Sequence, residues 1–235
     1  MFYYFEYFLG MPFRRRKSRE LPDVSFASRD GLLALGGEYT GECFEKAYRR
    51  GIFPWPYDGC ELIPWHCPPE RFVLFPEELH VSHSLKQTLK KNRFEIHADR
   101  AFAEVIHACA TVPRHDAGTW INEGMERAFC ELHERGMAHS VECYEDGRLV
   151  GGFYGTCIGR LFGGESMFMR VPDATKVAFV TFVRRGIDFG LKLIDCQCQT
   201  DNMARYGARE IPRSEFLSRL EELGSQNLDD GFWDF

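Results

Sequence analysis

The chain has 235 residues, and its 29 Lys and Arg against 35 Asp and Glu give a formal net charge of −6. Hydrophobic residues make up 44% and charged residues 27%, which is typical of a globular protein and excludes a disordered or fibrous chain. No apolar run approaches the ~18 residues that a membrane-spanning helix needs, which excludes an integral membrane protein. The length fits one large domain or two smaller ones.

The nine cysteines are odd in number and irregularly spaced, unlike the paired framework of a small secreted protein. We therefore expect a reducing, cytoplasmic environment. The closest pairs, Cys60/Cys67 and Cys196/Cys198, do not have the spacing of a zinc ligand set, so we expect no metal. Positive charge follows the aromatic residues 1–9 instead of preceding them, which does not fit a secretory signal.

Five prolines interrupt the segment 51–71, which reads as an ordered, aromatic-rich connector between two units. We place the boundary at Pro69, which gives a small amino-terminal domain over 1–69 and a larger domain over 70–235. A short helix is predicted over 41–50 in the first domain.

A second helix is predicted within residues 76–93, because apolar side chains recur there at helical spacing. On this helix Lys86, Lys90 and Arg93 lie at positions i, i+4 and i+7 and share one face, with Lys91 beside them. Such a face is either solvated or a phosphate-binding patch in an otherwise acidic protein. The spacing alone leaves both interpretations open.

From residue 138 onward the pattern becomes one of strands. The predicted elements are the strands 139–144, 149–155 and 161–168, the helix 173–190, the strand 191–200 and the helix 202–206. Asp146-Gly147 between the first two strands is a strong hairpin signal. Asp173 or Thr175 is expected to cap the long helix, whose buried apolar stripe extends to Ile187. This order of elements predicts an α+β fold with a central mixed sheet.

Three polar side chains in this region are candidates for a site. Side chains alternate along a strand, so Asp195 and Gln197 are expected on one face of the strand 191–200. A carboxylate in so apolar a strand needs a partner, because burial of an unpaired charge is costly. Glu165, which follows two glycines in the preceding strand, is a second such carboxylate. The three can form a pocket for a cation or an amine; alternatively, they face solvent or form a buried network that stabilises the sheet.

The strand–helix–strand order resembles the GNAT superfamily of acyltransferases. Members that bind acetyl-CoA carry a loop R-x-x-G-x-G after the strand, and its backbone N–H groups hold the pyrophosphate. The corresponding segment 169–176 contains no glycine and includes Pro172, which has no N–H to donate. A CoA-dependent acetyltransferase is therefore disfavoured.

Nine short motifs follow one another between residues 21 and 220. They are GLLALGG (31–37), YRRGIFPW (48–55), PER (69–71), GTWI (118–121), HSVE (139–142), GGFYG (151–155), GESMF (164–168), LIDCQ (193–197) and GAREIPR (207–213). Together and in this order they resemble the leucyl/phenylalanyl-tRNA–protein transferase family. Residues 1–20 and the acidic tail 229–235 lie outside this resemblance.

The resemblance implies an aminoacyltransferase of the bacterial N-degron pathway. Such an enzyme moves Leu or Phe, and less well Met, from aminoacyl-tRNA to the α-amino group of proteins that begin with Arg or Lys, which marks them for degradation. The family joins a small amino-terminal domain to a GNAT-like catalytic domain and uses no cofactor and no metal. We expect a cytoplasmic monomer without membrane association.

The resemblance also implies roles for individual residues. Gln197 is expected to contact the acceptor amine, Asp195 to orient the Gln197 side chain, and Glu165 to recognise the cationic acceptor residue. The residues expected around the donor side chain are Trp55, Trp120, Phe153 and Phe182. The resemblance favours the phosphate-patch interpretation, so the residues expected to bind tRNA are Lys86, Lys90, Lys91 and Arg93.

Five positions depart from the family pattern, among them Asn202, where His is frequent, and His66, where Trp is frequent. His83 and Gln87 stand where arginine is often found, and Phe153 stands where Met is common, which is expected to narrow the donor pocket.

Two other functions remain as alternatives. A catalytically inactive tRNA- or peptide-binding module would bind charged tRNA without forming a peptide bond. An acetyl-CoA-dependent N-acetyltransferase would be stabilised by acetyl-CoA, and we expect no such effect.

Overall fold

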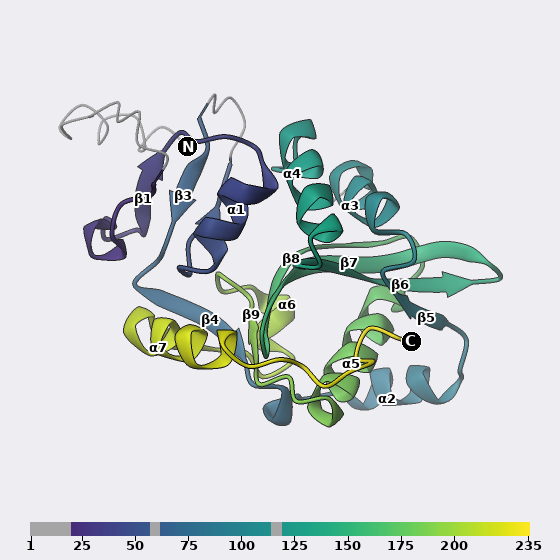
Figure 1. Ribbon diagram of the computed structural model, residues 1–235. Helices are drawn as coiled ribbons and strands as arrows, with labels where there is room; N and C mark the ends of the chain where they lie inside the picture. The colour runs from purple at the N-terminus through teal and green to yellow at the C-terminus, as the bar shows by residue number, and fades with distance from the viewer. Residues whose placement is uncertain (1–19, 57–61, 114–118) are drawn as a thin grey trace.

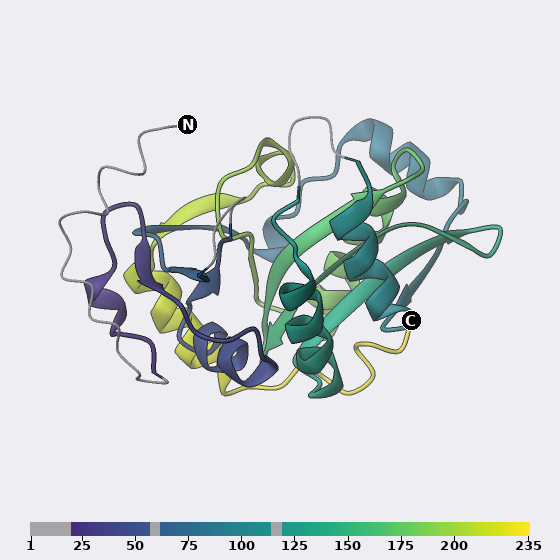
Figure 2. The same ribbon diagram turned by 90° about the horizontal axis from the view of Figure 1, so that it is seen from above.

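The computed structural model describes residues 20–56, 62–113 and 119–235 (Figures 1 and 2). The aromatic amino terminus and Cys60 lie outside the described residues. The described chain forms a three-stranded sheet, in the order β1-β3-β2, and a seven-stranded sheet, in the order β10-β4-β9-β8-β7-β6-β5. In both views the three-stranded sheet lies to one side of the large sheet, next to α7.

The amino-terminal part is built around one short helix. Its elements are the 3₁₀ turn Val24–Phe26, β1 Leu32–Leu35, α1 Gly41–Tyr48, β2 Phe53–Pro54 and β3 Pro64–His66. Thr40 caps α1, because its hydroxyl accepts a hydrogen bond from the Cys43 N–H at 3.3 Å. The predicted helix over 41–50 is confirmed and ends two residues earlier than expected.

The large sheet is mixed. Its strands are β4 Glu70–Leu74, β5 Glu95–Ala98, β6 Ala138–Glu145, β7 Arg148–Ile158, β8 Leu161–Met169, β9 Leu193–Asp195 and β10 Arg209–Pro212. Neighbouring strands are antiparallel except β8 and β9, which are parallel. The turn between β6 and β7 is the predicted Asp146-Gly147, with φ of 49° and 72°. The α+β fold with a central mixed sheet is confirmed.

Helices cover both faces of the large sheet (Figure 1). They are the 3₁₀ turn Pro76–Glu78, α2 His83–Lys90, α3 Phe102–Thr111, α4 Glu123–Glu134, α5 Ala174–Asp188, α6 Asp201–Ala204 and α7 Arg213–Gly224. α3 and α4 pack on one face, and α5 packs on the other. None of the helices within the described ranges is long and apolar enough to cross a bilayer.

The hydrophobic core continues from the three-stranded sheet into the large one. The Phe44 ring of α1 lies 5.3 Å from Trp65 of β3 and 5.6 Å from Phe129 of α4, centroid to centroid. Phe129 in turn lies 5.1 Å from Tyr154 of β7. The change from one sheet to the other between β3 and β4 agrees with a boundary near Pro69. Because the core crosses it, the division into domains 1–69 and 70–235 remains our proposal.

The basic face predicted within residues 76–93 is shorter than expected. α2 ends at Lys90, and Asn92 has a φ of 46°, so the helical path stops before Arg93. Arg93 instead pairs with Glu145 of β6, and its Nη2 lies 3.0 Å from the carboxylate Oε2. The prediction that Arg93 shares a helical face with the lysines is wrong, because the left-handed residue turns the chain toward the sheet.

Asp173, one of the two predicted caps, is the N-cap residue of α5, but the expected side-chain hydrogen bond is not formed. Its φ is 67°, and the hydroxyl of Thr175, the other predicted cap, donates to the Phe168 carbonyl of β8 instead. That hydroxyl ties the helix to the sheet. Ile187 is 38% exposed, so the buried stripe ends before it. The predicted stop at Gly190 is confirmed: its φ is 88°, which only glycine adopts without strain.

Candidate functional site

The site forms where β8 and β9 part. The two strands pair over only three residue pairs, from Leu161–Leu193 to Gly163–Asp195. Beyond Gly163, β8 continues alongside β7 to Met169, whereas β9 ends at Asp195 and the next two residues remain hydrogen-bonded to Phe72 of β4. Glu165 and Gln197 therefore each lie two positions beyond the last pair that joins the two strands.

The turn at Gln197 corrects the predicted strand over 191–200. β9 ends at Asp195, and Gln197 has a φ of 61°, which is uncommon for a residue other than glycine. The Asp195 Oδ1 stabilises this turn by accepting a hydrogen bond from the Gln197 backbone N–H at 2.8 Å. Strand alternation therefore stops before Gln197. Unbroken alternation would place Cys196 and Cys198 on one face, but they pack against different core clusters.

Asp195 is held by a buried arginine on β4. Arg71 Nε donates to Oδ1 at 2.7 Å and Nη2 donates to Oδ2 at 2.6 Å, a two-point contact between side chains that are 3% and 6% exposed. The third nitrogen, Nη1, donates to the Gly51 carbonyl at 3.1 Å. The guanidinium also lies between the rings of Phe53 and Phe216, 4.5 and 4.3 Å from their centroids.

This pair shows how Asp195 acts on Gln197. Asp195 was expected to contact the Gln197 side chain. Its carboxylate instead accepts hydrogen bonds from the Gln197 backbone N–H and the Arg71 guanidinium. Asp195 thus positions the side chain through the turn. The alternative of a buried network that stabilises the sheet is also realised, since the network joins β4 to β9.

Glu165 of β8 completes the constellation. Gln197 Nε2 donates to Glu165 Oε1 at 2.8 Å, while the shielded Oε2 has no hydrogen-bond partner among the described residues. The buried Tyr48 hydroxyl from α1 lies close enough to the Glu165 carboxyl to interact with it, although no hydrogen bond of good geometry joins the two. Burial, helped by the nearby Asp195 charge, raises the pKa of Glu165 to about 8. Burial and the Glu165 charge raise the pKa of Tyr48 well above its usual value.

The arrangement suits an amine or a cation. A carboxyl with a pKa of about 8 carries its proton at neutral pH, and a cationic ligand would favour its charged form. A shielded carboxyl with a strongly shifted pKa is typical of binding and catalytic sites. Within the described ranges, no group of three or more His, Cys, Asp or Glu side chains is arranged to hold a metal ion.

Residues 73–221 match the model of the family described as leucyl/phenylalanyl-tRNA protein transferase. The chain is 52% identical over 196 residues to the leucyl/phenylalanyl-tRNA–protein transferase of Nitrosomonas europaea, which covers 83% of each chain. It is 46% identical over 213 residues to that of Myxococcus xanthus, which covers 90% of this chain and 91% of the other. The chain belongs to the leucyl/phenylalanyl-tRNA protein transferase family.

Membership confirms the family and the enzyme class expected from the nine motifs: the protein is an aminoacyltransferase of this family. Among solved structures, the chain is similar to a GCN5-related N-acetyltransferase from Kribbella flavida at 15% identity and a TM-score of 0.37. That similarity covers 69% of this chain and 57% of the other. A likeness this distant carries nothing about function.

The aromatic residues expected around the donor side chain in this transferase fall into two groups. Phe153 and Phe182 lie 5.4 Å apart in the core on the α5 side of the sheet, 3% and 0% exposed. Trp120 is half-buried against the core cluster on the opposite face. Trp55 is 43% exposed and its ring lies 5.7 Å from Phe53, which also stacks on Arg71.

A hollow of about 270 Å³ lies near the α5 group. Its lining includes Met167, Phe179 and Tyr206 with the polar Asn202 at one side, but neither Phe153 nor Phe182 among the described residues. Phe153 is one ring removed from it, because it packs on Phe179 with ring centroids 5.9 Å apart. The two tryptophans lie elsewhere, and the four-residue donor pocket of this transferase remains a prediction.

The basic residues differ in their state of pairing. Lys86, Lys90 and Lys91 are exposed on and just after α2, and none of them pairs with an acidic side chain of the described ranges. Arg93 is already paired with Glu145. A free lysine is available to a phosphate, whereas Arg93 would first have to leave its partner. Contact of this transferase with tRNA through α2 remains a prediction.

Sequence reasoning missed two residues of the site. Arg71 and Tyr48 stand in the motifs PER and YRRGIFPW, so the motifs contained both positions. Nothing in the sequence pattern distinguished these two residues within their motifs, because the partner of each lies more than a hundred positions away in the chain. Arg71 meets Asp195 and Tyr48 lies near Glu165 only after the sheet has formed.

Proposed function

We propose that this transferase moves Leu or Phe, and less well Met, from aminoacyl-tRNA to the α-amino group of proteins that begin with Arg or Lys. The observation that supports it is the partly buried Glu165–Gln197 contact beside the point where β8 and β9 part, in a chain of this family. In the reaction the amine nitrogen attacks the ester carbonyl carbon. A C–N bond forms, the C–O bond to the ribose breaks, and the ribose oxygen takes up a proton.

The acceptor would be held by Glu165 and Gln197. Because Gln197 donates its N–H to Glu165, its own side-chain carbonyl remains to accept a hydrogen bond from the attacking amine. The Glu165 carboxylate is the natural partner of the cationic first residue. Alignment of two substrates is worth up to roughly 7–11 kcal/mol in well-oriented reactions, so positioning supplies most of what an activated ester needs.

The acceptor amine must lose a proton to attack. An α-amine has a reference pKa of about 7.7–8.0, so part of it is unprotonated near neutral pH. The neutral amide of Gln197 is a poor base. We therefore assign Gln197 to positioning and Glu165 to acceptor binding, with proton transfer through water or the ribose hydroxyl.

The donor side chain would enter the apolar region beside Phe153 and Phe182. Trp55 and Trp120 lie elsewhere in the fold, so their contact with the donor is proposed from the family resemblance alone. Discrimination there is steric, and one methylene of difference is worth about 1–3 kcal/mol. The unpaired Lys86, Lys90 and Lys91 would hold the tRNA backbone, with Arg93 a lesser contributor. Aminoacyl-tRNA is found in the cytoplasm, so the enzyme would act there. The added Leu or Phe would mark the acceptor protein for the N-degron pathway.

A transfer assay tests this function. The purified protein is mixed with radiolabelled Leu-tRNA or Phe-tRNA and with a protein that begins with Arg or Lys, in the absence of ATP and CoA. The matched acceptor begins with Ala. Label is expected on the first acceptor and not on the second. Tight binding of charged tRNA without any transfer would overturn the proposal and support the inactive binding module instead.

A further inference from the structure

The carboxy-terminal tail, residues 225–235, lies beyond the family match and packs beside α5. It follows α7, runs along the face of the large sheet that α5 covers, and ends near β5 (Figure 1). Arg160 holds its beginning, donating to the Asn227 carbonyl at 2.9 Å. Its end is held by the Ala98 N–H of β5, which donates to the Phe235 carbonyl at 3.0 Å.

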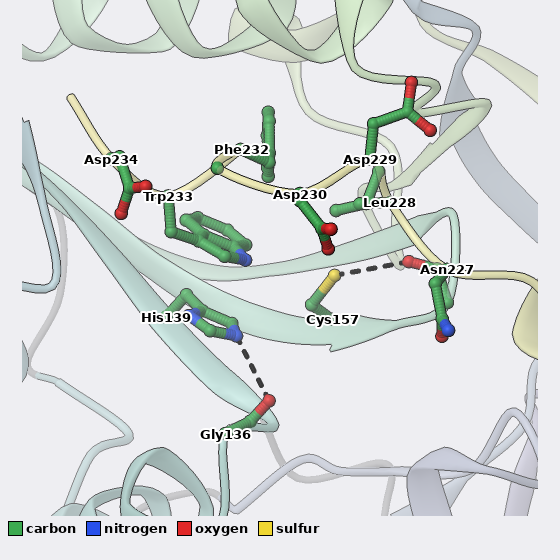
Figure 3. A pocket seen from close by; sticks show the side chains of 12 residues that line it. Gly136, His139, Cys157, Asn227, Leu228, Asp229, Asp230, Phe232, Trp233 and Asp234 are labelled. Atoms are coloured by element: carbon green, nitrogen blue, oxygen red, sulfur yellow. Dashed lines mark hydrogen bonds between the residues drawn. The ribbon is translucent and has the colours of Figure 1, made fainter.

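The middle of the tail is less closely packed than its end. A hollow of about 350 Å³ lies under it, lined among others by His139, Cys157 and Asp230 (Figure 3). Contact with the core is concentrated at Phe232, which is 2% exposed, and at the neighbouring Trp233.

Two aromatic residues of the tail are fixed from several sides. Trp233 stacks on His139 of β6 with ring centroids 3.9 Å apart and planes 6° apart (Figure 3). His139 is itself held by Asp99, whose Oδ2 lies 2.6 Å from Nδ1. Arg185 of α5 donates to the Phe232 carbonyl at 2.7 Å. These contacts leave neither ring free to shift on its own.

The rings of Phe232 and Trp233 both pack against the Phe182 ring. Phe182 lies 5.6 Å from Phe232 and 6.0 Å from Trp233 on the tail side, and 5.4 Å from Phe153 on the other. Its side chain is fully buried, so its position is set by its neighbours. The two tail rings are therefore part of the packing that holds Phe182, together with Phe162 of β8, whose ring centroid lies 4.7 Å away.

We propose that Trp233, together with Phe232, positions Phe182 and thereby sets the size of donor side chain that the enzyme accepts. The inference rests on the proposed function, in which Phe182 lines the donor pocket. Protein interiors are close-packed, so truncation of one buried side chain leaves a cavity. Neighbouring rings then shift part of the way into that cavity. Shortening Trp233 lets Phe182 move away from Phe153, which enlarges the pocket and favours Phe over Leu.

The test compares kcat/KM for Phe-tRNA and Leu-tRNA in the full-length protein. Trp233→Ala is expected to raise the ratio of Phe to Leu by about fivefold, within the range that one methylene of space produces, with charged-tRNA affinity unchanged. Trp233→Phe keeps a ring on His139 and should return the ratio toward that of the wild type. Phe189→Ala is the control: Phe189 packs on Phe232 at 6.0 Å and makes no ring contact with Phe182 within the described residues.

The outcomes separate three failures. If the wild type transfers neither amino acid, the proposed function fails. If the wild type is active but Phe182→Leu leaves the ratio unchanged, the pocket assignment fails. If Phe182→Leu shifts the ratio and Trp233→Ala does not, or if Phe189→Ala shifts it equally, the role of the tail is overturned. Should Trp233→Ala be unstable, the ratio measured on Trp233→Leu decides in the same way.

Discussion

Arg71→Met removes one partner of the buried ion pair on which the turn at Gln197 depends. The change keeps an apolar side chain between Phe53 and Phe216, so most of the packing survives. It leaves the Asp195 carboxylate buried with the Gln197 N–H as its remaining hydrogen-bond partner among the described residues. Loss of one member of a buried pair costs about 3–5 kcal/mol, and we expect the free energy of unfolding to fall by that amount.

The charge, rather than the side-chain volume, should account for this loss. Asp195→Asn alone leaves Arg71 unpaired and is expected to cost a similar amount. The double variant Arg71→Met/Asp195→Asn buries no uncompensated charge, so its loss should be smaller than the sum of the two single losses by about 1–3 kcal/mol. Transfer activity should fall in all three variants, because the turn that presents Gln197 to Glu165 loses its support.

Urea unfolding at neutral pH measures the loss, with Arg219→Met as the matched control. Arg219 pairs with Glu215 on α7, where both side chains are about 40% exposed. Such exposed pairs are worth about 0–1 kcal/mol. If Arg71→Met destabilises the protein no more than Arg219→Met does, or if the two single losses simply add, the buried pair is not what holds the turn.

Three further predictions concern the site and the tRNA surface. The pKa of Glu165 is raised from 4.5 to about 8 on folding, so the stability it contributes is present below about pH 4.5 and is lost as the pH rises toward 8. Relative to Glu165→Gln, the wild type should therefore lose about 3 kcal/mol of unfolding free energy between about pH 5 and 8, and parallel pH curves for the two proteins would contradict this. Gln197→Asn tolerates the left-handed backbone but is too short to reach Glu165, so transfer should fall by about 100-fold while the unfolding free energy changes by less than ~1 kcal/mol; undiminished transfer would remove Gln197 from the mechanism. Replacing Lys86 and Lys90 with Ala should weaken tRNA binding and reduce the slope of log K against log salt concentration by about 2. Arg93→Ala should change this slope little, because Arg93 is paired with Glu145. Equal slopes in the wild type and the double-lysine variant would contradict the assignment.

Local features of the fold were accessible from the sequence because their causes lie within a few residues. The Asp146-Gly147 hairpin follows from two residues that tolerate positive φ, and the end of α5 follows from Gly190. The start of α1 follows from the hydroxyl of Thr40, three residues from the N–H that it accepts. The order of nine motifs was sufficient to predict the family, which the relatives confirm.

Where a side chain had two possible partners, only the tertiary structure decided between them. Thr175 can cap its own helix, but the carbonyl of Phe168 lies close enough to take the hydroxyl. Arg93 would extend the basic face of α2, but Glu145 on β6 draws it to the sheet. In both cases a partner brought near by folding outcompetes the local arrangement that the spacing predicts.

The site itself depended on contacts between distant parts of the chain. Glu165, Asp195 and Gln197 could be named from the sequence as polar groups in apolar strands. Their arrangement could not, because it needs Arg71, which is 124 positions before Asp195, and a turn that the ion pair stabilises. Strand alternation predicts direction only while a strand lasts. The end of β9, the place of Gln197 and the packing of the tail on Phe182 were set by which side chains the folded chain buries together.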